Sequence, residues 1–171
     1  GDMIEVSSDP LDLGTSDFTA CVWVKTASTN RPILSNQASG GDAYNGFNFY
    51  IAASGKLSPT VDWGTSGQYG VITSNSTVDS NAWVNCVFVF TSADRTNWKI
   101  YINGVEDGVT ESGVDLSGGG ISNAIPLTIG KRTVSSDTLL GNIGPVHIYN
   151  RALSAEEVLH NYNGLKGRFG L

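Results

Sequence analysis

Alternation of apolar and polar side chains with a period of two constrains the fold of this chain more than any other feature. In the run Phe18 to Lys25, the apolar residues Phe18, Ala20, Val22 and Val24 occupy alternate positions. This spacing predicts a strand with one face on a core. Comparable runs predict further strands at Met3–Val6, Pro32–Asn36, Phe47–Ala53, Leu57–Trp63, Tyr69–Ser74, Trp83–Thr91, Trp98–Ile102, Leu127–Gly130 and Asn142–Tyr149.

Local sequence signals predict a hairpin turn, a long loop and one helix. Asn103-Gly104 predicts a hairpin turn that returns through Val105–Gly108, whereas Ser112–Ser122 lacks periodicity and predicts a long loop. Near the end, Ser154 and Glu157 form a capping-box pattern, and Leu153 and Val158 form a hydrophobic staple. These residues predict a short helix over Ala155–Tyr162 that Gly164 ends. Many strands with one late helix predict an all-β fold: a two-sheet antiparallel sandwich of the jelly-roll type.

Length and charge exclude several classes of protein. A chain of 171 residues predicts a single domain over 1–171, and its opening Gly-Asp-Met indicates a processed product or part of a larger protein. Ten Lys and Arg residues in a chain of net charge −6 argue against nucleic acid and against an anionic membrane surface as partners. No apolar run is long enough for membrane insertion. Cys21 and Cys86 are expected to be buried thiols, with one cross-strand bridge as the alternative.

A series of motifs in register resembles the laminin G-like and pentraxin-like branch of the concanavalin A-like jelly rolls. The motifs are the Phe18-Thr19 and Trp23-Val24-Lys25 strand, Ile33–Ser35, Trp83, Trp98–Gly104, Pro126–Gly130, Gly141–Gly144 and Ile148–Glu157. The C-terminal stretch Asn161–Leu171 resembles tails on such domains in structural proteins of marine bacteriophages. The resemblance implies a concanavalin A-like jelly roll that is displayed on a virion or cell surface for adhesion, and hence an extracellular or virion location.

The residues do not predict catalysis. Glycosidases on this fold need two facing carboxylates, but Glu106 and Asp107 are adjacent and Glu156 and Glu157 lie on the capped helix. Neither His147 nor His160 has the context of a Gly-x-Ser-x-Gly motif, which would supply a serine nucleophile. We therefore expect no enzyme activity.

Binding of a glycan or polysaccharide fits the sequence better, because sugars are recognised by an aromatic face with polar groups around it. Trp63 and Tyr69 bracket a polar turn and are candidates for a stacking platform. The polar loop Gln37–Gly46 adds Tyr44 and Asn45, and Arg132 offers a cation for an acidic sugar or another carboxylate. Trp23 and Trp83 are expected to be structural, and Trp98 is open between packing and exposure.

The resemblance to pentraxins also implies calcium. Their metal lies between two loops, which correspond here to the loop with Asp42 and Asn45 and the segment from Lys131 to Asp137. Lys131 and Arg132 stand where pentraxins have ligands, so we expect one Ca²⁺ site or none, with Asp42 and Asp137 as its metal ligands.

Three functions thus follow in order. The first is a non-catalytic, lectin-like carbohydrate-binding module. The second is a structural protein–protein module of a phage virion or large surface protein, with other virion or surface proteins as partners. The third is a glycoside hydrolase or lyase.

Overall fold

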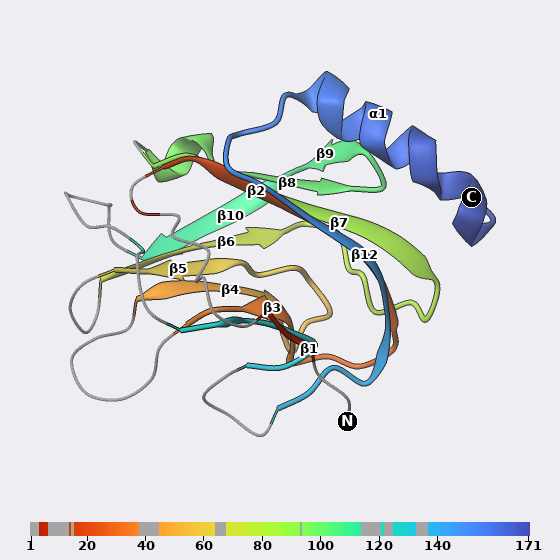
Figure 1. Ribbon diagram of the computed structural model, residues 1–171, viewed down its shortest axis with the longest axis horizontal. Helices are drawn as coiled ribbons and strands as arrows, with labels where there is room; N and C mark the ends of the chain where they lie inside the picture. The colour runs from red at the N-terminus through yellow and green to blue at the C-terminus, as the bar shows by residue number, and fades with distance from the viewer. Residues whose placement is uncertain are drawn as a thin grey trace.

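The computed structural model describes residues 4–6, 14, 16–37, 45–63, 68–92, 94–113, 121, 125–132 and 137–171. In this part of the chain, two antiparallel sheets form a sandwich (Figure 1). The seven-stranded sheet has the order β1 (Ile4–Val6), β11 (Leu127–Ile129), β3 (Arg31–Ser35), β4 (Gly46–Ile51), β5 (Thr60–Asp62), β6 (Tyr69–Ser74) and β10 (Val109–Gly113). The five-stranded sheet has the order β12 (Gly141–Tyr149), β2 (Phe18–Thr26), β7 (Trp83–Phe90), β8 (Lys99–Ile102) and β9 (Val105–Asp107).

The predicted all-β jelly-roll sandwich is confirmed, and the differences are local. The segment Leu57–Trp63 is a strand only over Thr60–Asp62, since Leu57 makes an isolated bridge to Ile51. Strand β10 was not predicted, because its residues are mostly exposed and carry no apolar alternation. It takes Ser112 and Gly113 from the predicted loop 112–122, of which residues 114–120 and 122 lie outside the described residues.

The core between the sheets is built from the alternate apolar positions that define the strands. Phe18 on β2 stacks on Phe90 with ring centroids 4.9 Å apart and packs at 5.1 Å against Phe47 of the opposite sheet. Trp98 is buried in the same core, which settles its role as packing. Because Phe47, Phe49 and Ile51 of β4 face this core, the residues between them face outward.

The C-terminal helix begins as predicted and ends later. Helix α1 (Ala155–Leu165) is capped by Ser154, whose hydroxyl accepts from the Glu157 backbone while the Glu157 carboxylate accepts from the Ser154 backbone. The prediction that Gly164 ends the helix is wrong. A glycine inside a helix costs about 1 kcal/mol and does not break it. The chain continues into the 3₁₀ turn η2 (Lys166–Phe169), which ends at Gly170 with a φ of 75°.

This C-terminal segment covers the outer face of the five-stranded sheet, where α1 lies over β8 and β9 (Figure 1). The ring of Phe169 stacks on Trp23 at 4.2 Å and contacts Trp83 at 4.7 Å. Tyr162 stacks on the same Trp23 at 5.7 Å. Trp23 is therefore structural, as expected, but it is buried beneath the tail of the chain and not between the sheets.

The two cysteines are buried free thiols. Val22 pairs with Cys86 and Cys21 pairs with Val87, so the two cysteines occupy opposite faces of neighbouring strands. Cys86 lies in the core between the sheets, and Cys21 packs with Leu153 and Val158 beneath the helix. A disulfide between them is excluded by this register. The described residues contain no helix long and apolar enough to cross a membrane.

Candidate functional site

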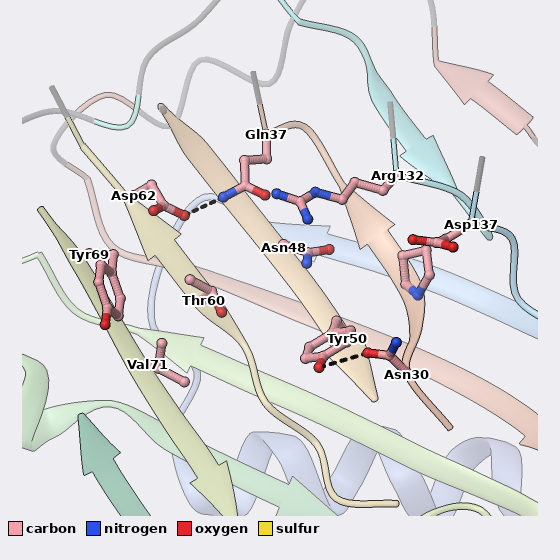
Figure 2. A pocket seen from close by; sticks show the side chains of 11 residues that line it. Asn30, Gln37, Asn48, Tyr50, Thr60, Asp62, Tyr69, Val71, Arg132 and Asp137 are labelled. Atoms are coloured by element: carbon pink, nitrogen blue, oxygen red, sulfur yellow. Dashed lines mark hydrogen bonds between the residues drawn. The ribbon is translucent and has the colours of Figure 1, made fainter. Parts of the chain in front are cut away.

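A pocket of about 490 Å³ lies on the outer face of the seven-stranded sheet (Figure 2). Its floor consists of outward-facing residues of β4, β5 and β6, namely Asn48, Tyr50, Thr60, Asp62, Tyr69 and Val71. The strand register places them in rows. Thr60 pairs with both Asn48 and Val71, and Asp62 pairs with Tyr69. Neighbouring positions on one face of a sheet have Cβ atoms about 5 Å apart, so these side chains form one continuous surface.

The rim of this strand-face pocket comes from segments next to the strands. Asn30 and Pro32 lie at the start of β3, Gln37 follows its end, and Arg132 and Asp137 follow β11. In Figure 2 the side chains of Gln37 and Arg132 extend toward each other. The Tyr50 hydroxyl donates to Asn30 Oδ1 at 3.2 Å and closes the opposite end.

Asp62 is the more deeply buried of the two acids that line the pocket. It is 9% exposed, and its carboxylate accepts a hydrogen bond from Nε2 of Gln37, which is 4% exposed. Burial raises the pKa of Asp62 to about 6, while the Gln37 hydrogen bond and the positive charge of Arg132 act in the opposite direction. At pH 7 the side chain is thus mostly ionised, but its charge is held in a poorly solvated place.

Three buried polar atoms of the pocket residues have no hydrogen-bond partner. They are Gln37 Oε1, Asn48 Oδ1 and Arg132 Nε. The amide orientation of Gln37 follows from chemistry, because only its NH₂ group can donate to the Asp62 carboxylate. A buried polar atom without a partner costs about 1–3 kcal/mol, so native proteins rarely keep several together. Among the described residues, the two other atoms of this kind are Trp63 Nε1 and Arg31 Nε, and they belong to residues that do not line the pocket.

The structure brings together three of the predicted site residues. Tyr69, Arg132 and Asp137 all line the strand-face pocket, and Tyr69 is 40% exposed. Asn45 directly precedes β4 and does not line it. The predicted residues Asp42 and Tyr44 lie outside the described residues.

Trp63 does not form part of the predicted stacking platform. Its side chain is 1% exposed and belongs to the core between the sheets. Side chains along a strand alternate between its two faces. Trp63 comes two positions after Val61 of β5, so both side chains face the core, whereas Thr60 and Asp62 face the pocket. The indole is therefore unavailable to a ligand, and of the pair only Tyr69 offers an exposed ring.

Sequence reasoning missed Asn48, Thr60 and Asp62. The available signal was their position between apolar neighbours, as in Phe47-Asn48-Phe49 and Thr60-Val61-Asp62. That alternation places polar side chains on an outer face, but only the pairing of β4 with β5 makes them neighbours.

The predicted metal ligand Asp137 lies in a cationic environment. Its carboxylate is 3.5 Å from Arg31 Nη1, and its backbone carbonyl accepts from the backbone N–H of Arg132 at 3.5 Å. Among the described residues there is no group of three or more His, Cys, Asp or Glu side chains able to hold a metal. The predicted partner of Asp137 in a calcium site, Asp42, lies outside the described residues.

The other acids singled out in the sequence have structural contacts. Glu106 pairs with Lys99 at 2.9 Å, and Glu157 pairs with Arg151 at 2.7 Å. Asp107 accepts hydrogen bonds from the backbone of Asn75 and Ser76 and so ties β9 to the turn after β6. His147 and His160 are exposed.

Solved structures share this fold. The CBM40 of the Ruminococcus gnavus IT-sialidase, solved bound to alpha2,3 sialyllactose, is 17% identical with a TM-score of 0.65, over 95% of this chain and 97% of that one. The native heptameric SAP-like pentraxin from Limulus polyphemus is 17% identical with a TM-score of 0.64, over 92% of this chain and 73% of that one. The binding domain of Paraclostridial Mosquitocidal Protein 1 is 18% identical with a TM-score of 0.70, over 95% of this chain and 41% of that one.

These identities support a common fold and no more, since one fold hosts many functions. No curated protein matches the chain. A family model, however, matches residues 1–159 of the 171. The chain therefore belongs to the concanavalin A-like lectin/glucanases superfamily.

Proposed function

We propose that this chain is a non-catalytic, lectin-like domain that binds a glycan in the strand-face pocket. The observation that carries the proposal is the set of three buried polar atoms without partners at Gln37, Asn48 and Arg132. A bound sugar supplies the missing partners, because each ring hydroxyl both donates and accepts hydrogen bonds. Tyr69, on the β6 side of the same pocket, offers an exposed aromatic surface suited to the apolar face of a sugar ring.

The size of the pocket supports the same function. At about 490 Å³ it lies within the range of roughly 300–1,000 Å³ that is typical of small-ligand sites. Its position also supports binding by preformed groups, because Asn48 and Tyr69 stand on strands of a packed sandwich. Because these groups are already held in place by the strands, less conformational entropy is lost when a ligand binds.

A glycosidase needs two carboxylates that flank the scissile bond, and Asp62 and Asp137 both line the pocket. Their contacts favour binding over catalysis. Asp62 is held by Gln37, and Asp137 lies next to Arg31. The proposal therefore predicts binding without release of sugar fragments.

The test is a glycan array followed by calorimetry with purified protein. Asn48→Ala is expected to weaken binding about tenfold or more, since it removes one buried partner from the pocket. Asn163→Ala, on the exposed face of α1, is the matched control and should bind as the wild type does. Absence of binding across neutral and acidic polysaccharides, or loss of binding in both variants alike, contradicts the proposal. Chromatography of the incubated glycan detects any hydrolysis.

Calcium dependence and surface display are part of the same proposal and need their own tests. Calorimetry in 2 mM CaCl₂ and in EDTA shows whether a metal contributes; this concentration is about the upper end of what weak extracellular calcium sites require. Display on a virion or cell surface predicts that antibodies against the folded domain label intact particles or cells of the source. A protein–protein module would instead be recovered with a defined partner and would show no glycan binding.

A further inference from the structure

We propose that the strand-face pocket selects charge-neutral, hydroxyl-rich sugar units over acidic sugars at neutral pH. This inference rests on the glycan-binding function proposed above and concerns the class of glycan. It follows from two properties of the pocket: which hydrogen-bonding atoms lack partners, and which charges surround them.

The first property is the mixture of donors and acceptors. Gln37 Oε1 and Asn48 Oδ1 are acceptors, whereas Arg132 Nε is a donor. An asparagine amide can present either its oxygen or its NH₂ group to a ligand, so their complement is a ligand with at least one donor and one acceptor. Neighbouring hydroxyl groups of a neutral sugar meet this demand, since every hydroxyl has one hydrogen and two lone pairs.

A carboxylate does not meet it. An ionised carboxylate only accepts, so it satisfies Arg132 and leaves its lone pairs facing those of Gln37 Oε1. The Gln37 amide cannot turn to relieve this conflict, because its NH₂ group is committed to Asp62. The buried acceptor of Gln37, at 4% exposure of the residue, therefore disfavours an anion.

The second property is charge. The described lining of the pocket contains one cationic side chain, Arg132, and two anionic ones, Asp62 and Asp137. The positive charge of Arg132 already acts on Asp62. Asp137 is paired with Arg31 at 3.5 Å, so an acidic sugar would place its charge beside Asp62, with Arg132 to balance these two negative charges. In a poorly solvated pocket such like charges repel strongly.

The experiment compares matched pairs that differ in charge: lactose with α2,3-sialyllactose, and galactan with polygalacturonate. Wild-type protein at pH 7.5 is expected to bind the neutral member of each productive pair at least tenfold more tightly. Tighter binding of the acidic members overturns this inference and leaves the proposed glycan binding intact. Binding to no glycan in the wider array overturns the proposed function itself.

Asp62→Asn separates charge from shape. The substitution removes a negative charge and keeps an oxygen that accepts from Gln37, so the preference for the neutral member should fall about threefold or more. Glu5→Gln, on exposed β1, makes the same change in net charge away from the pocket and should leave the preference unchanged. An equal preference in Asp62→Asn and the wild type would overturn the charge argument.

Discussion

The Gln37 amide donates to the carboxylate of Asp62, and this contact fixes which end of the amide faces the strand-face pocket. Gln37 follows β3, and Asp62 ends β5, with β4 lying between the two strands. A single hydrogen bond thus joins both sides of the pocket across a strand. It also keeps a charge in a place where burial opposes ionisation.

The first prediction concerns stability and pH. The pKa of Asp62 in the folded protein is about 6, above the ordinary value of 3.8 for an aspartate. The folded state therefore binds more protons than the unfolded state between these values, and stability falls as the pH rises through this window. Asp62→Asn removes this pH-dependent loss of stability. The variant should be more stable than the wild type by about 1–3 kcal/mol at pH 8, and most of this difference should be gone at pH 4. Urea unfolding at both pH values measures it, with Glu5→Gln as the control. An equal gain at both pH values would count against the buried charge.

The second prediction concerns the exposed ring of Tyr69. Tyr69→Ala should weaken glycan binding about tenfold, because the stacking surface is lost. Tyr69→Phe keeps the ring and should lose less than threefold. Since the residue is 40% exposed, Tyr69→Ala should change the free energy of unfolding by less than about 1 kcal/mol. Calorimetry and thermal melts provide both numbers, and equal binding by all three proteins would exclude Tyr69 from the site.

The third prediction concerns Arg132. Arg132→Gln should reduce affinity about 10- to 150-fold, as expected for loss of a hydrogen bond from a charged group worth about 1.5–3 kcal/mol. Arg168→Gln, in the exposed turn η2, removes the same charge on the other side of the molecule and should bind normally. If both substitutions weaken binding equally, the effect is one of overall charge and not of the pocket.

The fourth prediction concerns the tail of the chain. Phe169→Ala should destabilise the protein by about 1–3 kcal/mol, because Phe169 covers Trp23 and Trp83. Leu171→Ala changes an apolar residue that is 50% exposed two positions later and should cost less than about 0.5 kcal/mol. Urea unfolding followed by circular dichroism measures both. Equal stability of the two variants would show that the tail contributes little.

The fifth prediction concerns the thiols. Burial raises the pKa of Cys21 to about 12 and raises that of Cys86 further. Because the thiolate is the reactive form, neither should react with Ellman's reagent within minutes at pH 8. Both should react once the protein is unfolded in guanidinium chloride. Rapid reaction of one thiol in the native protein would contradict its burial.

Sequence periodicity predicted the strands because one face of each strand packs on the core. It failed where that condition fails: β10 has mostly exposed side chains, and the alternation around Leu57 ends in a bridge before β5 begins. The helix start was predictable from local capping residues. Its end was not, because the turn that follows is held by Phe169 on Trp23, a contact far apart in the sequence.

The candidate site was predictable only in part for a related reason. Tyr69 was predicted from its residue type beside a turn, and the same reasoning wrongly included Trp63. Arg132 was singled out through the resemblance to the pentraxin loops. Asn48 and Asp62 become a site only through strand register, which no local pattern encodes. Once Val61 is known to face the core, the alternation along the strand shows that Asp62 faces the pocket and that Trp63 faces the core.

The tail that seals Trp23 also gives the domain an orientation. Helix α1 and η2 lie over the five-stranded sheet, whereas the pocket opens from the outer face of the other sheet. A linker, label or solid support attached beyond Leu171 would therefore leave the pocket directed away from its anchor. A C-terminal tether would present the sheet that carries Asn48 and Tyr69 to the surroundings, as an adhesive surface requires.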